Sequence, residues 1–311
     1  MSITLYFSKI NINSHILEVY EDKKKRDEIL KLVFLNLKEG ISYKKENLKY
    51  IENGETYTYN ADYKLNKIIK MNDNTIVGNV IKTSYLFANK INEETGEVTK
   101  IPIENSEMIE FFFDVYKEVI VYYRTNRFGY TEFPEAFKEF INICMSSKQE
   151  EYNFEVSVLR EGLKVEDIEK ELKRIGRLET LKIEIIPPNP DDELLDGIQE
   201  NGEEFITGVK EGNVTYTSTA FESKDSRGLN LDAKIIKKEL NKINNIHSKL
   251  TDEKATRNGY VTVEATNKNG RFYSTNNSKP IKDKLEVKPS TITEYAVLCK
   301  QKIVSLINSL N

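Results

Sequence analysis

Short segments in which apolar and polar residues alternate recur along this chain, and they constrain its fold more than any other feature. Residues 3–8 alternate in this way, and several such segments lie between Gly54 and Phe87, separated by polar breaks. Alternation with a period of two is typical of strands that bury one face, and closely spaced strands form antiparallel meanders. Residues 111–123 are almost continuously apolar, which indicates one or two central strands.

Other segments carry apolar residues at the spacing of a helix. Residues 21–38, the segment that follows Pro134, and residues 292–310 show this pattern, and Pro134 suits the first turn of its helix. Cys144 and Cys299 fall on the apolar sides of two of these helices, so we interpret both as core thiols. This mixture predicts an α+β fold in which mixed or antiparallel sheets pack against helices.

A polar segment at residues 146–151 divides the chain into two expected domains. We expect residues 1–148 to form an acidic N-terminal α+β domain that serves interaction or oligomerisation. Residues 149–311 are expected to form a C-terminal α+β domain with a basic, nucleic-acid-binding surface. Within it, a strand at 154–158, a helix at 165–175 and a strand at 181–185 predict a βαβ unit with parallel strands, as in ferredoxin-like folds.

The C-terminal part contains further predicted elements. Residues 191–209 are expected to be helical and residues 214–221 to form a strand. The Asn269-Gly270 dipeptide marks a hairpin, and Thr291 and Glu294 have the spacing of a capping box for the last helix.

Charge is divided unevenly along the chain, although the formal net charge is only −4. Residues 224–311 carry 17 Lys and Arg against 9 Asp and Glu, a net of +8, so residues 1–223 carry the remaining 29 and 41, a net of −12. A basic block points to a polyanionic partner, and an acidic remainder limits indiscriminate binding. The alternative is chance scatter of charge in a lysine-rich sequence.

The composition excludes several classes of protein. With two cysteines and two histidines, His15 and His247, the chain has neither a zinc-finger pattern nor a disulfide framework. It contains no run of about 18 apolar residues and no secretory signal, so we expect a cytoplasmic protein without membrane insertion. Glycine motifs for phosphate or dinucleotide binding are absent, and neither histidine suits a catalytic triad. We therefore expect no cofactor and no metal.

A predicted helix at residues 231–250, capped by Asn230, carries lysines along one side. At about 100° per residue, the apolar residues Ile236, Leu240, Ile243 and Leu250 fall opposite to these lysines, which are Lys234, Lys238, Lys242 and Lys249. A row of lysines can follow a phosphate backbone through salt-sensitive contacts. The alternative is the solvated face of an ordinary amphipathic helix.

More cations lie close to this helix in the sequence, among hydroxyl and amide side chains that commonly contact phosphate and sugar. They are Lys224 and Arg227 in the preceding loop, and Arg257, Lys268, Arg271 and the aromatic Tyr273 around the hairpin.

A second candidate patch lies at residues 122–130, where Arg124 and Arg127 are interleaved with four aromatic rings. Aromatic stacking with cationic support is how many proteins bind single strands. In the alternative interpretation the rings pack inward and the arginines pair with Glu132 and Glu135.

Asp191, Glu222 and Lys224 trace the outline of a magnesium-dependent nuclease, which needs two carboxylates and a lysine around the metal. Glu222 follows a predicted strand, as such a site requires. However, an acid two residues before a lysine also occurs at residues 171–173, 232–234 and 286–288. Because the spacing is so common in this chain, the nuclease stays an alternative.

Three segments together carry a resemblance to known proteins: residues 3–11, residues 178–190 with their Ile-Ile-Pro-Pro-Asn-Pro ending, and the basic region after Ser223. They look like an uncharacterised family of bacterial proteins associated with mobile elements and phage defence. In length, two-domain layout and basic half, the chain is similar to RexA-like phage-exclusion proteins and to the DNA-binding subunit of Kiwa-type defence systems. The resemblance implies binding of duplex DNA without sequence specificity, self-association, and a protein partner from the same operon.

We therefore expect a non-enzymatic DNA-binding protein of an anti-phage defence or phage-exclusion system. The alternatives are the magnesium-dependent nuclease and a protein-interaction module without a nucleic-acid role.

Overall fold

The computed structural model describes residues 2–52, 55–72, 74–146, 151–190 and 204–310. The chain forms two compact units, and each is assembled from separate stretches of sequence. Unit 1 comprises Met1–Leu5, Lys31–Ser146 and Asp283–Asn311, and unit 2 comprises Tyr6–Leu30 and Ser147–Lys282. The expected division into residues 1–148 and 149–311 stays a prediction.

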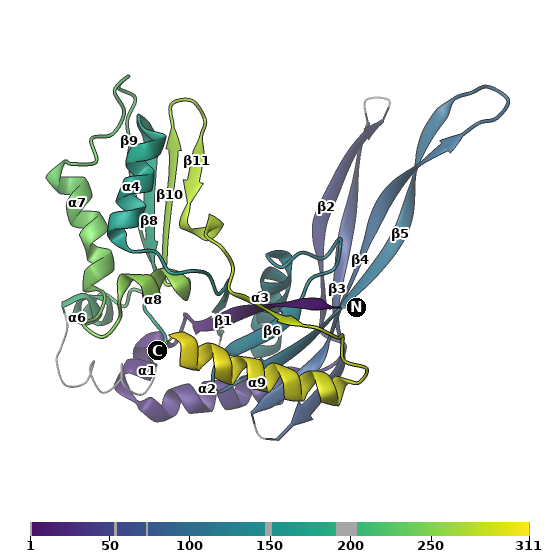
Figure 1. The fold of residues 1–311 in the computed structure, drawn as a ribbon, viewed down its shortest axis with the longest axis horizontal. Coiled ribbons are helices and arrows are strands. Elements are labelled where there is room, and N and C mark those ends of the chain that lie inside the picture. The colour runs from purple at the N-terminus through teal and green to yellow at the C-terminus, as the bar shows by residue number, and fades with distance from the viewer. Residues whose placement is uncertain (1, 53–54, 73, 147–150, 191–203, 311) are drawn as a thin grey trace. The chain divides into compact units, whose positions relative to one another are not determined.

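The larger sheet is antiparallel and curls into a half-barrel (Figure 1). Its meander consists of β2 (Ser42–Glu52), β3 (Glu55–Met71), β4 (Thr75–Ile91), β5 (Val98–Asp114) and β6 (Val119–Tyr123). Within the described residues its strand order is β12-β1-β6-β5-β4-β3-β2, where β1 is Ile3–Ile12, β12 is Lys282–Leu285, and β7 (Phe154–Val158) also pairs with β1. The predicted meander and the apolar central strands are confirmed.

Aromatic packing joins this sheet to α3 (Glu132–Met145) in the core of unit 1. The Tyr122 ring stacks on Phe133 with centroids 4.1 Å apart, and Phe111 meets Phe137 edge-on at 5.0 Å. All four side chains are fully buried. Pro134 lies in the first turn of α3, as predicted, because that turn needs no proline N–H.

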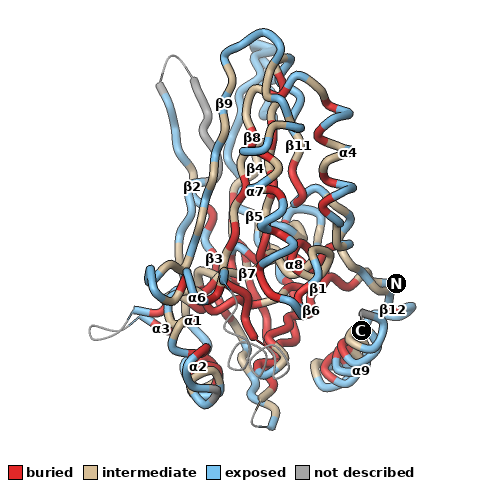
Figure 2. Tube along the Cα trace, turned by 90° about the vertical axis from the view of Figure 1, so that its left-hand side faces the viewer, coloured by how far each residue is buried: buried red, intermediate tan, exposed pale blue. Residues whose placement is uncertain are grey.

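The helices predicted at residues 21–38 and 292–310 are present, and a short helix at residues 16–21 was not predicted. The N-terminal part contains α1 (Ile16–Glu21) and α2 (Lys23–Asn36), and the chain closes with α9 (Ile292–Leu310). Figure 2 shows α9 with one buried and one exposed side, and the buried side includes Tyr295 and Cys299. Burial raises the pKa of the Cys299 thiol to about 12, consistent with a core thiol. Cys144 is only half-buried.

The smaller sheet lies in unit 2 and is antiparallel throughout, in the order β11-β10-β8-β9. Its strands are β8 (Leu178–Ile185), β9 (Thr217–Glu222), β10 (Val261–Asn267) and β11 (Phe272–Ser274). The predicted hairpin around Gly270 joins β10 to β11, and Gly270 adopts a φ of 77° that favours glycine. The helices that the structure describes in this unit include α4 (Val165–Ile175), α6 (Glu204–Glu211), α7 (Lys234–Asn241) and α8 (Asp252–Arg257), with α1 and the first part of α2.

The ferredoxin-like βαβ prediction is wrong. β7 pairs antiparallel with β1 in the larger sheet, whereas β8 lies in the smaller one, so α4 connects two sheets and not two parallel neighbours. Alternation correctly identified both strands and the helix between them. It carries no information about which strand pairs with which, and that is the part that failed.

The long helix predicted at residues 231–250 is also wrong in its extent. α7 ends at Asn241, a 3₁₀ turn follows at Lys242–Asn245, and the Asn230 side chain accepts from the Asp232 N–H at 3.0 Å instead of capping the helix. Three asparagines between residues 241 and 245 explain the early end, because asparagine favours turns over helix interiors. Of the helix predicted at 191–209, residues 191–203 lie outside the described residues.

Candidate nucleic-acid interface

The lysines of α7 lie on the exposed side of that helix. Lys234, Lys238 and Lys242 are exposed, while Ile236 and Leu240 are buried beneath them. The sequence placed lysines and apolar residues on opposite sides, and this part of the prediction is confirmed over the length of α7. The early end of the helix separates Lys249, which is exposed within the turns that follow.

These lysines form one wall of a groove of about 800 Å³ between α6 and α7. Lys234, Lys237, Lys238 and Lys242 line it from α7 and the turn that follows, and Phe205, Gly208, Val209 and Val214 line it from α6 and the segment after it. The groove therefore combines a cationic wall with one that is mostly apolar but also includes Glu204.

Two of the four lysines are neutralised by neighbouring acids. Lys237 lies 3.2 Å from the Asp232 carboxylate, and Lys242 lies 2.7 Å from Glu239. For Lys234 and Lys238 the described residues provide no ion-pair partner. An uncompensated ammonium group on an exposed helix face gains most from an external anion, so these two lysines are the strongest part of the wall.

The loop before α7 is largely neutral. Lys224 pairs with Glu222 and lies 4.0 Å from Glu179, and the Arg227 Nε donates to Asp225 at 3.0 Å. These contacts raise the pKa of Lys224 through its hydrogen bond to Glu222, and they lower the pKa of Asp225 through Arg227. The loop brings its cations to the surface, but each has an acid of its own.

The predicted residues of the hairpin do not converge on one surface. Arg271 is exposed, whereas Lys268 contacts Glu179 at 3.7 Å and donates to the Ser223 carbonyl. Arg257 is half-buried, and its Nε is buried without a hydrogen-bond partner in the described residues.

Tyr273 points its hydroxyl into the protein. Burial raises its pKa to about 12, and Glu171 and Asp167 of α4 add to the effect. A ring that lies beneath α4 and beside two carboxylates is not positioned for stacking with a base.

Acidic residues fold together with the basic block. Residues 147–223 belong to the same unit and carry 9 Lys and Arg against 19 Asp and Glu. This segment has a net charge of 9 − 19 = −10, which offsets the positive charge of the basic residues in the same unit.

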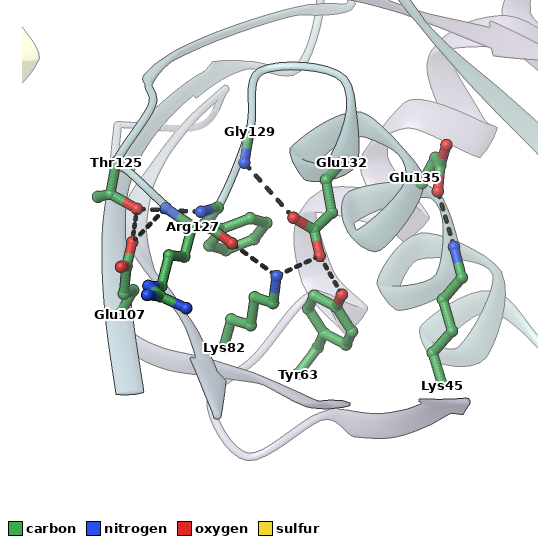
Figure 3. A network of polar contacts seen from close by, with 10 residues as sticks. Lys45, Tyr63, Lys82, Glu107, Thr125, Arg127, Gly129, Glu132 and Glu135 are labelled. Carbon is green, nitrogen blue, oxygen red and sulfur yellow. Dashed lines mark hydrogen bonds and ion pairs between the residues drawn. The ribbon is translucent and has the colours of Figure 1, made fainter. Parts of the chain in front are cut away.

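Hydrogen bonds and ion pairs fix the conformation of the second candidate patch, at residues 122–130 (Figure 3). Tyr122, Tyr123 and Phe128 are buried, so stacking by these three rings is ruled out, while Arg124 and Arg127 are exposed. Glu107 accepts from the Thr125 hydroxyl and, at 3.1 Å, from the Arg127 N–H. The inward packing of these three rings, which was the alternative interpretation, is confirmed.

The same network contains a buried ion pair that the sequence analysis missed. The Lys82 ammonium lies 2.7 Å from the Glu132 carboxylate and donates to the Arg127 carbonyl at 2.6 Å. The Tyr63 hydroxyl also donates to Glu132. Glu132 therefore binds Lys82 and Glu135 binds Lys45 at 2.8 Å, so the expected pairing of these acids with the two arginines is wrong.

A signal for Lys82 was present in the sequence. It follows Ile76, Gly78 and Val80 at every second position of β4, which places its side chain on the inward face. A lysine at an inward position requires a buried acceptor, and that requirement predicts a nearby carboxylate.

The structure describes two of the three residues of the alternative nuclease site, Glu222 and Lys224. Asp191 lies outside the described residues, and Glu222 forms an ion pair with Lys224. No cluster of three or more His, Cys, Asp or Glu with metal-binding geometry occurs in the part of the chain that the structure describes.

The fold and the groove define a class: an α+β protein with two antiparallel sheets in which one helix presents a cationic wall. The chain belongs to the family described as a domain of unknown function, DUF4747, whose model matches residues 3–305. No curated protein matches the chain. Among the described helices, none is both long and apolar enough to span a bilayer.

Proposed function

We propose that this chain is a non-enzymatic DNA-binding protein that holds duplex DNA without sequence specificity through the lysine wall of α7. The observation that carries the proposal is the pair of exposed lysines, Lys234 and Lys238, which have no ion-pair partner among the described residues. Lys237 and Lys242 line the same groove, but each is paired with an acid, Asp232 and Glu239 respectively.

Several features support phosphate as the ligand class. Lysine is a flexible point charge that contacts phosphates without reading base edges, so a wall of lysines supports affinity without sequence specificity. The acids on the rest of unit 2 would repel a polyanion elsewhere and direct it to α7. The interface is consequently smaller than the twelve residues expected from the sequence, and Lys234, Lys238 and Lys242 form its centre.

The biological setting follows from the sequence resemblance. A role in a bacterial anti-phage defence or phage-exclusion system, a cytoplasmic location, self-association and an operon-encoded partner are all parts of the proposal.

The test is a low-salt binding assay with duplex and single-stranded probes, with and without Mg²⁺. We expect retention of duplex DNA whose log affinity falls with log salt by about 0.9 for each phosphate contacted. Changing Lys234, Lys238 and Lys242 together to Glu should abolish retention. The matched control reverses three exposed lysines of unit 1, Lys31, Lys38 and Lys64, and should bind with at most a small loss.

Each other outcome points to a different class of protein. Equal binding by the two triple variants removes α7 as the interface. Cleavage of the probe in Mg²⁺ that Glu222→Ala abolishes would establish the nuclease. No shift at low salt, together with co-purification of a defined partner protein, would establish the interaction module.

A further inference from the structure

Among the described residues, the outer half of the β4–β5 hairpin has no ladder to a third strand. β4 and β5 pair along their whole length, from Thr75–Asp114 to Ile91–Val98. The β3–β4 ladder, however, ends at Asp62–Thr83, and the β5–β6 ladder involves only residues 111–114 of β5. Figure 1 shows the outer parts of β2–β3 and of β4–β5 as two separate arms. We call the segment from Ser84 to Asn105 the β4–β5 arm.

One face of this arm carries an exposed apolar row. Directly opposed residues share a face, so Leu86–Ile103 and Ala88–Ile101 lie on the same side as the core pair Val80–Ile109. Ile101 is 39% and Ile103 is 46% exposed. The polar pairs Lys82–Glu107 and Ser84–Asn105 separate this row from the core pair. An isolated two-stranded ribbon is marginal in water, and an apolar row on such a ribbon indicates a surface that another protein covers.

The two edges of the arm differ in how open they are to another strand. β5 is protected by Pro102, which has no N–H, and by the charge of Glu104. β4 has no proline between Ser84 and Ile91 and only one charge, Lys90. The Tyr59 ring contacts Tyr85 and Phe87, which point to the face opposite the apolar row, so the row itself is left uncovered by this cluster.

We propose that a second copy of this chain occupies the arm by antiparallel pairing of β4 with β4. The β4 edge is self-complementary. With Phe87 on the two-fold axis, Leu86 of one copy lies opposite Ala88 of the other, Tyr85 opposite Asn89, and Ser84 opposite Lys90. No like charges meet. The apolar row therefore runs from Ile103 and Leu86 of one copy to Ala88 and Ile101 of the other. The two-fold symmetry produces a second, identical row in the same interface.

This dimer gives the self-association in the proposed function a surface, and its test does not depend on DNA. The register also explains why pairing stops at Lys90, because from Thr83 inward the β4 edge is already occupied by β3. Each interface therefore comprises the seven residues from Ser84 to Lys90, with the apolar rows of both copies on one face.

The experiment measures molar mass by sedimentation over a wide concentration range. Wild type should approach twice the chain mass of 36.1 kDa. Ile101→Lys with Ile103→Lys should remain at the chain mass, because it places four ammonium groups in the shared row. The control, Glu93→Gln with Glu94→Gln, adds the same net charge at the turn of the arm and should dimerise like wild type.

A second measurement covers the case in which the lysine variant loses its fold by circular dichroism. Leu86→Cys with Ala88→Cys should form a covalent dimer on oxidation, since directly opposed residues of antiparallel strands lie within disulfide range. Each single variant and wild type are the controls and should form none. A wild-type chain that stays at 36.1 kDa, a control variant that fails to dimerise, or the absence of the covalent dimer would each overturn the proposal, and retained DNA binding in that event would leave the α7 interface intact.

Discussion

The buried ion pair between Lys82 and Glu132 gives the sharpest stability prediction. The Lys82 side chain is 8% exposed and that of Glu132 is 25% exposed. Water therefore compensates the charge of Lys82 less than that of Glu132, so removing the partner costs more for Lys82. Glu132→Gln preserves the shape but leaves a desolvated ammonium without its counter-charge, which costs about 3 kcal/mol or more. Lys82→Met keeps most of the volume and leaves a partly hydrated carboxylate that still accepts from Tyr63, so we expect a cost of about 1 kcal/mol.

Urea unfolding followed by far-ultraviolet circular dichroism measures these differences. In a unit of about 150 residues, 3 kcal/mol corresponds to a fall in Tm of roughly 6–12 °C. The double variant should resemble Lys82→Met alone, because removing the lysine also removes the need for the carboxylate. Equal costs for the two single variants, or strictly additive costs in the double variant, would refute the inference that Lys82 is the dependent partner.

Two further predictions concern unit 2. Gly162→Ala should lower the free energy of unfolding by about 1–3 kcal/mol, because a Cβ there would lie 2.3 Å from the Glu253 carbonyl oxygen. Gly208→Ala should raise it by about 0.5–1 kcal/mol, because Gly208 is exposed in α6 and a Cβ there would have no atom within 4 Å. Thermal unfolding of the two variants tests both predictions, and a stabilised Gly162→Ala variant would contradict the packing at Gly162. Because burial raises the pKa of Tyr273 from 10.0 to about 12, its contribution to stability is complete below pH 10 and is lost as the pH rises toward 12. The stability of wild type relative to Tyr273→Phe, followed by urea unfolding, should fall over that range, and a difference that is constant with pH would be evidence against a buried hydroxyl.

The sequence predicts the elements of this fold well and their assembly poorly. The β2–β6 meander, α3 with its proline, α4, the Gly270 hairpin and α9 all follow from apolar periodicity and turn residues, which are local properties. The pairing of β7 with β1 is not local, since it joins residues about 150 positions apart, and no periodicity encodes it.

The sequence predicts which lysines of the candidate site are exposed, but it does not predict which cations are paired with acids. Helical spacing correctly put Lys234 and Lys238 on the exposed side of α7. Whether a cation finds an acid depends on residues that arrive from elsewhere in the chain, as Glu179 does for Lys268 across 89 positions of sequence. Net charge along a sequence therefore overestimates a binding surface wherever an acidic segment folds against a basic one.

The return of the last helix to unit 1 has a consequence for biosynthesis. The Tyr295 hydroxyl donates to the backbone carbonyl oxygens of Glu110 and Val121, and Lys288 lies over the ring of Tyr123. These strands emerge from the ribosome long before α9 does, and all of unit 2 after residue 147 is translated in between. The part of the half-barrel that α9 covers consequently stays uncovered until α9 has been translated. Nascent chains that stall before residue 292 should be recognised by chaperones and proteases as incomplete.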